Sequence, residues 1–301
     1  MERIKYLFGL QNLTKVIPNN DSNSKIEVLE KKKFFTDNEI QDSAKIAKAF
    51  INCKYILVVD SEGKGGFDGK KKVMPVGNLV VNLINALNLD VSYHCRLINN
   101  IEIDSQYSDM EFEIKKGNIT YGISLEDELN SEVDTEIGCS LTQQFYNLSF
   151  IFNPRNSKEI QICEGIKWLG QSIVEADIKI AFVKVMIALE CVAEVNPNNA
   201  YMNPSITYQI ATMLSLVNGY DYKSRKEIVE KIKTIYGKRS IVFHGNAAKK
   251  QKIGIEDVKY VQRMVQQFIF NVIQSQELNK YDSIQDIWKY INTKILKQWQ
   301  K

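Results

Sequence analysis

The sequence predicts an α+β N-terminal domain at residues 1–157, followed by an all-α helical bundle at residues 158–301. The first region mixes short β-branched runs with helical patterns, whereas the second shows apolar residues at helical spacing almost throughout. An apolar run at 148–152 closes the first region, and the sequence NPRNS at 153–157 is typical of a turn at a domain boundary. A chain of 301 residues has room for two domains of ordinary size.

Short elements of both kinds are expected in the N-terminal domain. The sequence TDNE at 36–39 is a capping-box pattern ahead of a helix that would run to about residue 51. The β-branched run YILVV at 55–59 suits a buried strand. The remaining expected elements are a helix at 78–89 and strands near 91–103, 110–114 and 119–125.

A glycine-rich basic segment, SEGKGGFDGKKK at 61–72, follows the strand at 55–59 and resembles a phosphate-binding loop at first sight. Such a loop requires Gly, four residues, Gly, Lys and then Ser or Thr. Here Lys64 stands five positions before Gly69, and Lys71 occupies the hydroxyl position. The spacing therefore argues against a nucleotide cradle, and the segment is predicted to be a surface loop.

Metal-ligating and thiol-bearing residues give no convincing cofactor site. The acidic segment at 126–136 lacks an accompanying histidine or glycine turn, which favours a solvated loop over a metal site. His94, between Tyr93 and Cys95 in an expected strand, is interpreted as structural. The five cysteines are scattered without a CxxC pair, which favours reduced thiols over a zinc site or disulfides. We therefore expect no metal and no cofactor.

The C-terminal region is helical by the spacing of its apolar residues. Ile162, Ile166, Leu169 and Ile173 fall on one face of the first helix. This first helix is expected from about residue 157 onward, and further helices are expected at 178–195, 205–217, 224–236, 255–275 and 282–299. The last one carries an apolar stripe that suits either the core or a second copy of the chain, made of Ile284, Ile287, Trp288, Ile291 and Ile295.

Charge is divided unevenly between the two regions. Residues 1–157 carry 18 Lys and Arg against 22 Asp and Glu, a net charge of −4, while residues 158–301 carry 21 against 14, a net charge of +7. The basic half suits either a nucleic-acid partner or a solvated lysine-rich surface. No signal peptide and no membrane-spanning run is recognisable, so we expect a cytoplasmic protein without a membrane partner.

One motif carries most of the functional interpretation, the ten residues YGKRSIVFHG at 236–245. Within it, Arg239 precedes His244 by five positions. Arginine binds phosphate through a planar fork of donors, and histidine exchanges protons near neutral pH. RNA supplies its own nucleophile, the 2′-hydroxyl, so a histidine for proton transfer and an arginine for the phosphorane charge can cleave it without a metal.

Helical geometry limits what one copy of the motif can do. Five positions separate Arg239 and His244 by about 140° around an ideal helix. Two copies that face each other across a twofold axis would supply two histidines and two arginines to one phosphate. The sequence thus predicts a homodimer with a composite site. The alternative is structural, with Arg239 paired to an acidic residue and His244 closing a helix before Gly245.

The helical region resembles a HEPN domain of the Apea-like branch over roughly residues 158–275. The residues that carry the resemblance are IKWLG at 166–170, IALE at 187–190 and the motif at 236–245. The resemblance implies an all-α HEPN-type bundle that dimerises and a metal-independent endoribonuclease. Such enzymes form a 2′,3′-cyclic phosphate and act in toxin–antitoxin or antiphage abortive-infection systems.

Carried over residue by residue, the resemblance makes Arg239 the phosphate ligand and His244 the proton-transfer residue. Ser240 would support them through a hydrogen bond, and Glu190 would orient Arg239 or Ser240, although an ordinary ion pair explains Glu190 as well. Trp168 and Tyr236 are interpreted as core residues. The remaining site candidates, for contacts with the RNA backbone, are Lys238, Lys223 and Arg225.

Two other functions are compatible with the sequence. A HEPN scaffold could bind RNA or a partner without cutting it, or residues 1–157 could sense a nucleotide signal. In the leading interpretation, residues 1–157 sense a trigger or restrain the nuclease. The expected partners are an RNA substrate, a second copy of the chain, and an antitoxin or trigger molecule.

Overall fold

The computed structural model divides the chain into two compact units, Met1–Asn147 and Leu148–Lys301, and each is described by itself. The α+β region followed by a helical region agrees with the expected fold class. The structure describes the backbone of residues 3–11, 13–16, 26–30, 53, 55–62, 67–90, 94–104, 139–141, 147–193, 205–244 and 253–299, with side chains for most of them.

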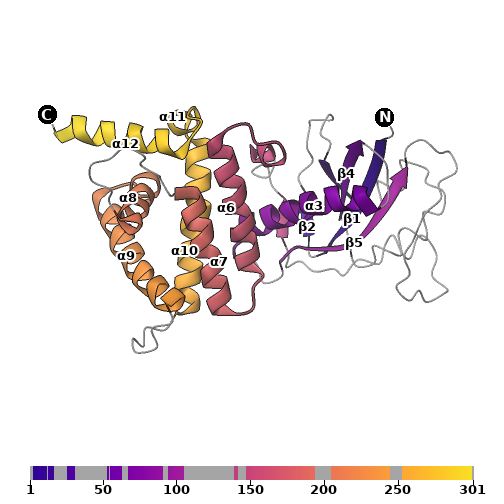
Figure 1. Cartoon of the computed structure of the whole chain (residues 1–301), viewed down its shortest axis with the longest axis horizontal. Coiled ribbons are helices and arrows are strands. Elements are labelled where there is room, and N and C mark those ends of the chain that lie inside the picture. The colour runs from indigo at the N-terminus through magenta and orange to yellow at the C-terminus, as the bar shows by residue number, and fades with distance from the viewer. Residues whose placement is uncertain are drawn as a thin grey trace. The chain divides into compact units, whose positions relative to one another are not determined.

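The first unit is built on an antiparallel sheet of four strands in the order β3-β4-β1-β5. Its central strand β1 buries both Leu7 and Phe8 completely. Neighbouring side chains of a strand point to opposite faces, so both faces of the sheet are covered at this point. The strands are β1 (Arg3–Gln11), β3 (Ile26–Glu30), β4 (Tyr55–Glu62) and β5 (Arg96–Asp104) (Figure 1), and β2 (Leu13–Val16) pairs in parallel with β6 (Cys139–Leu141).

Helix α3 (Phe67–Leu87) packs closely against this sheet. A Cβ atom added to Gly77 would lie 3.1 Å from Leu97 and 3.7 Å from Phe8, so the glycine allows the close approach. The side chain of Asn85 fixes the chain before β5, because its Nδ2 donates to Cys95 O at 3.1 Å and its Oδ1 accepts from Cys95 N at 2.8 Å.

The prediction of a surface loop at 61–72 is wrong for most of its length. Strand β4 continues to Glu62, and α3 begins at Phe67 instead of at residue 78. Burial explains the difference, since Val73 is only 3% exposed and Val80 is fully buried. An amphipathic helix is stabilised mainly by packing of its apolar face, and here that packing outweighs the glycines and Pro75 within the helix.

Other N-terminal expectations have mixed outcomes. The strands expected at 55–59 and 91–103 are confirmed as β4 and β5, although β5 begins five residues later than expected. The strands β1, β2, β3 and β6 were not predicted. His94 lies just before β5 and is half-buried, and burial together with the charge of Arg96 lowers its pKa. The helix at 36–51, the strands at 110–114 and 119–125, and the acidic segment at 126–136 lie outside the described residues.

The second unit contains all six helices expected from the sequence, with shifted ends (Figure 1). The largest shift concerns the helix predicted at 224–236, which continues eight residues further, to His244. The helices are α6 (Ser157–Ile173), α7 (Ile178–Ala193), α8 (Ile206–Asn218), α9 (Tyr222–His244), α10 (Ile255–Gln274), a short α11 (Gln276–Asn279) and α12 (Ile284–Trp299). In α12, Ile284 and Ile287 are fully buried, so this part of its stripe belongs to the core.

The unit boundary lies between Asn147 and Leu148, ten residues before the end predicted at 157. The apolar run that was expected to close the first domain forms a 3₁₀ turn, η1 (Ser149–Phe152), and packs on α6. Leu148 and Ile151 are 2% and 3% exposed, and the Cys163 thiol donates to Ile151 O. Burial against α6 therefore assigns these residues to the helical unit.

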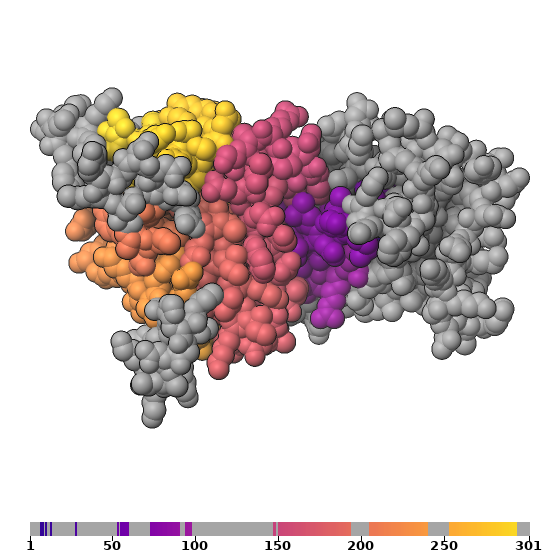
Figure 2. All heavy atoms as spheres, in the orientation of Figure 1, coloured from indigo at the N-terminus to yellow at the C-terminus, as the bar shows by residue number. Residues whose placement is uncertain are grey.

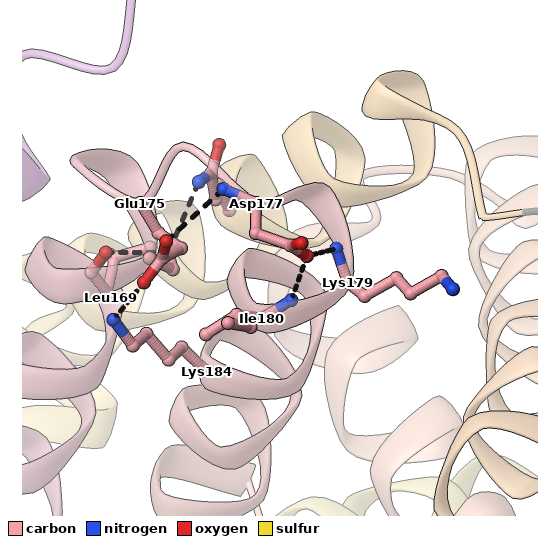
Figure 3. Close-up of polar contacts among 8 residues, drawn as sticks. Leu169, Glu175, Asp177, Lys179, Ile180 and Lys184 are labelled. Atoms are coloured by element: carbon pink, nitrogen blue, oxygen red, sulfur yellow. Dashed lines mark hydrogen bonds and ion pairs between the residues drawn. The ribbon is translucent and has the colours of Figure 1, made fainter. Parts of the chain in front are cut away.

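Helices α6 and α7 form a closely packed pair joined by a polar turn. In that turn, Glu175 accepts hydrogen bonds from Lys184 Nζ at 2.7 Å and Asp177 N at 3.2 Å, while Asp177 Oδ1 accepts from the amides of Lys179 and Ile180 (Figure 3). These bonds satisfy amide groups at the start of α7 that have no partner within the helix. The turn thus fixes where α7 begins.

Two helical glycines are expected to respond in opposite ways to alanine. A Cβ at Gly165 would lie 2.2 Å from Val192 Cγ1, so Gly165→Ala forces α6 and α7 apart and should cost about 1–3 kcal/mol. Gly237 has no atom within 4 Å of the added Cβ, so Gly237→Ala should stabilise the protein by about 0.5–1 kcal/mol. Urea unfolding of both variants measures the free energy of unfolding, which should fall for Gly165→Ala and rise for Gly237→Ala. The same change in both variants would contradict the packing described.

Candidate functional site

Helix α9 presents a buried face that ends in an arginine. Ile228, Ile232, Ile235 and Tyr236 follow one another at helical spacing and are 8%, 0%, 0% and 7% exposed. Arg239 comes three positions after Tyr236 and four after Ile235, so it continues the same face. The sequence therefore directs a charged side chain toward the neighbouring helices, where it needs a partner.

Glu190 of α7 provides that partner. Its Oε1 lies 2.8 Å from Arg239 Nη2, and its Oε2 accepts a hydrogen bond from the same nitrogen at 3.0 Å. The Tyr236 hydroxyl donates to Glu190 Oε1 at 3.2 Å, and the guanidinium carbon lies 5.8 Å from the centre of the Tyr236 ring. The side chains of Arg239 and Glu190 are 31% and 19% exposed. The pair is thus half-buried, and the Arg239 side chain keeps about a third of its surface exposed although its Nε atom is buried.

This cluster joins two of the three sequence segments that carry the HEPN resemblance. Glu190 ends the segment IALE, and Tyr236 and Arg239 open the motif 46 and 49 residues later. Tyr236 is buried, as expected, and also donates a hydrogen bond, which was not expected. Trp168, from the third segment, is half-buried on α6, where Lys167 Nζ lies 5.9 Å from its ring.

The backbone positions of Ser240 and His244 are described, but their side chains lie outside the described part of the structure. His244 is the last residue of α9, and the helix is continuous between Arg239 and His244. The two positions are therefore separated by about 140° around the axis and about 7.5 Å along it. Position 244 shares its direction, within about 20°, with Lys226, Lys233 and Gly237, which are all exposed.

Lys238 is engaged by an acidic residue of α10. Asp257 is 5% exposed, and its Oδ2 accepts from Lys238 Nζ at 2.6 Å and Gly254 N at 3.0 Å. Lys231 Nζ lies 3.4 Å from the other oxygen. Burial alone would raise the pKa of Asp257, but the hydrogen bonds from Lys238 and Gly254 and the charge of Lys238 lower it below its ordinary value. Lys238 thus links α9 to α10.

The other two candidates for RNA contacts differ in their surroundings. Lys223 is exposed on the first turn of α9. Arg225 is also exposed, but its Nε donates to Gly219 O at 3.1 Å and so holds the turn between α8 and α9. Of the three lysine and arginine candidates, Lys223 and Arg225 are thus exposed, whereas Lys238 is half-buried.

The described residues offer little for cofactor or thiol chemistry. Among them, no group of three or more His, Cys, Asp or Glu side chains is placed to hold a metal ion. No described helix is long and apolar enough to cross a membrane. Burial raises the pKa of Cys163 to about 12, so this thiol stays protonated at neutral pH. The cysteines with described side chains form no disulfide with one another: Cys53, Cys95, Cys163 and Cys191.

Comparisons with protein-family models, curated proteins and solved structures found no significant match for this chain. The family and the role of each site residue therefore remain predictions from the sequence.

Sequence reasoning missed the contacts of Asp257. The signal available was its place three residues after Gly254, near the start of an apolar helical pattern, where an acidic residue is favoured. That pattern places Asp257 in the first turn of a helix but does not say which lysines it meets. The pairing with Lys231 and Lys238 depends on how α9 and α10 pack.

Removing the Glu190 carboxylate should destabilise the helical unit. Glu190→Ala leaves Arg239 half-buried without this partner, which should cost about 1–3 kcal/mol. Tyr236→Phe removes one hydrogen bond to the same carboxylate and should cost about 0.5–1.5 kcal/mol. Since both changes act on one group, the double variant should lose less than the sum. Glu164→Ala, which breaks an exposed pair with Lys167, is the control for denaturant unfolding.

Asp257 should make the free energy of unfolding depend on pH in the acidic range. Its pKa is lower in the folded protein, so its contribution is present above the unfolded value of about 3.9 and is lost as pH falls toward the folded value. Asp257→Asn should therefore be less stable than wild type at pH 7, and the gap should narrow below pH about 4. Urea midpoints measured across pH test this, with Glu256→Gln, exposed on the same turn, as control. A gap independent of pH would contradict it.

Proposed function

We propose that the helical unit is a metal-independent endoribonuclease of the HEPN type. The observation that carries the proposal is the contact of Glu190 and Tyr236 with Arg239. These residues were singled out by resemblance from segments far apart in the sequence, and they meet at one half-buried position. An arginine that is held by two neighbouring side chains and is still partly exposed suits a phosphate ligand.

In this function, Arg239 binds the non-bridging oxygens of the scissile phosphate. A histidine removes the proton of the 2′-hydroxyl, whose oxygen attacks phosphorus. The bond to the 5′-oxygen breaks, and that oxygen takes a proton from a second acid. The products are a 2′,3′-cyclic phosphate and a 5′-hydroxyl, and Ser240 supports the site through a hydrogen bond.

A second copy of the chain supplies the missing acid. The continuity of α9 supports this part of the proposal, because a straight helix directs positions 239 and 244 about 140° apart. Across a twofold axis, position 244 of one copy, on the helix face that also carries Lys226 and Lys233, can approach Arg239 of the other. The composite homodimer then has an arginine and a proton-transfer residue on each side of the phosphate.

A non-catalytic HEPN scaffold is the second candidate function. The same ion pair favours it, because Glu190 already neutralises the charge of Arg239 and stabilises the contact between α7 and α9. In that case Arg239 and Glu190 hold the bundle together, and RNA or a protein partner binds without being cut.

The biological setting follows from the resemblance. A ribonuclease of this kind is proposed to act as a toxin or antiphage effector, with an antitoxin or trigger as partner. The first unit is proposed to sense that trigger or a nucleotide signal. Its separate core around β1 is compatible with a regulatory domain that folds on its own contacts.

Conservative substitutions at the two proposed catalytic positions separate the candidates. His244→Gln and Arg239→Lys should each lower the rate of RNA cleavage by at least about 100-fold, because glutamine exchanges no proton and lysine lacks the planar fork. Cleavage of labelled RNA in the presence of a chelator is measured, and the ends are analysed for cyclic phosphate. Wild-type rates in either variant would refute the catalytic assignment.

Mixing wild type with an excess of His244→Gln tests the composite site. A dimer of one wild-type and one His244→Gln copy keeps both arginines but only one of the two histidines, so it lacks either the base or the acid. The excess of His244→Gln should therefore lower cleavage well below that of the same amount of wild type alone. An active wild-type enzyme that sediments as a monomer would contradict the composite site, and denaturant unfolding checks that both variants fold.

A further inference from the structure

Two tyrosines at the start of α9 are unusually open to solvent. Tyr220 and Tyr222 are 87% and 82% exposed, so their rings bury almost nothing within this chain. They flank Asp221, in the turn between α8 and α9. Large aromatic side chains stabilise a fold mainly through burial. These two are too exposed to stabilise it in this way.

The turn that carries them is held in place by its backbone contacts. Asp221 Oδ1 accepts from Ser224 N at 2.7 Å, and Asp221 N donates to the Ser224 hydroxyl oxygen at 3.1 Å. Arg225 Nε donates to Gly219 O, and a Cβ at Gly219 would lie 2.5 Å from both Ser215 O and Arg225 Cγ. The two rings are thus presented by a fixed turn, which lowers the entropy cost of binding through them.

The exposed face of α9 continues from these rings toward the end of the helix. Six exposed residues lie within about 60° of the direction of position 244: Tyr222, Lys223, Lys226, Glu230, Lys233 and Gly237. The half-buried Val229 lies at the edge of this range. Lys226 and Glu230 approach only to 3.9 Å, with side chains 62% and 66% exposed. Three lysines against one glutamate leave this face with a net positive charge (the region from α8 to α9 is orange in Figure 2).

We propose that this face of α9, with Tyr220 and Tyr222 at its start, binds single-stranded RNA and leads it toward position 244. The tyrosines stack with bases, which are free to stack only in a single strand. The three lysines contact successive phosphates. The inference rests on the proposed ribonuclease function and assigns to it a substrate class, single-stranded RNA, and a binding surface outside the Arg239 cluster.

The length of the face sets the length of the strand. From position 222 to position 244 the helix rises about 33 Å, and a stacked strand advances about 3.4 Å per nucleotide. About ten nucleotides therefore cover the face. Gly237 suits the path as well, because nothing of this chain lies within 4 Å of an added Cβ there.

The test uses fluorescent 2′-O-methyl oligonucleotides, which lack the attacking hydroxyl and so cannot be cut. Anisotropy should show an affinity that rises up to about ten nucleotides and then levels off. Tyr220→Ala with Tyr222→Ala should raise Kd at least about tenfold. Lys223, Lys226 and Lys233 changed together to Ala should reduce the slope of log K against log salt by about 2.

Matched controls come from the same helical unit. Tyr208→Ala removes a tyrosine of α8 that is 52% exposed. No lysine is adjacent to Tyr208 in the sequence. Changing the exposed Lys179, Lys259 and Lys289 to Ala removes the same charge from other helices. Neither control should change Kd more than about twofold, and thermal unfolding of every variant should stay near wild type.

Several results would overturn the proposal. These are unchanged binding in the tyrosine variant, equal losses in the controls, tighter binding of a duplex, or binding of poly-glutamate as tight as that of the oligonucleotide. The last result would make the face a site for an acidic protein. The oligonucleotides cannot be cut, so binding is measured independently of cleavage. If the variants lose binding but the wild-type protein never cleaves RNA, the surface is supported and the ribonuclease function is refuted. If the wild-type protein cleaves RNA but the tyrosine variant binds normally, the ribonuclease function is supported and this surface is refuted.

Discussion

The ion pair between Glu190 and Arg239 is the interaction on which the arrangement of α7 and α9 around the site depends. Arg239 continues a helix face whose other members are buried, so leaving its partly exposed charge without a partner would cost about 1–3 kcal/mol. Glu190 removes that cost only if α7 is placed so that both carboxylate oxygens reach one guanidinium nitrogen. Tyr236 then limits the freedom of the carboxylate, and the guanidinium is fixed as a consequence.

Helix α9 has three sides with different surroundings. One side packs its isoleucines into the core and ends at Arg239, and a second side reaches α10 through the Lys231 and Lys238 pairs with Asp257. The third side is exposed and includes position 244. This division explains why the helix continues past Gly237. The residues after it still make contacts with α7 and α10, and these outweigh the roughly 1 kcal/mol cost of a helical glycine.

The helical unit could be predicted from its sequence because each of its helices repeats apolar residues at a single period. The first unit was predicted only in part: the strands expected at 55–59 and 91–103 correspond to β4 and β5, but β1 was missed because it is buried on both faces and shows no alternation that separates it from a helix. The first residues of α3 were wrongly predicted as a loop for a related reason, since glycines and lysines mark loops locally while burial of Val73 decides the outcome. At the candidate site, the motif at 236–245 singled out Arg239 and the resemblance singled out Glu190, whereas the contacts of Asp257 depend on packing between helices that no local pattern encodes.

The choice of arginine at position 239 follows from the two demands placed on it. A phosphate that displaced Glu190 would leave a half-buried carboxylate with the Tyr236 hydroxyl but without the guanidinium, which is unfavourable. In the proposed function the phosphate must therefore bind in addition to Glu190, at another edge of the same group. A guanidinium has five donors in a rigid plane and can bind two anions at once, whereas an ammonium offers three donors around one point. A lysine at this position could keep the ion pair with Glu190 and still fail to hold the phosphate in a defined orientation.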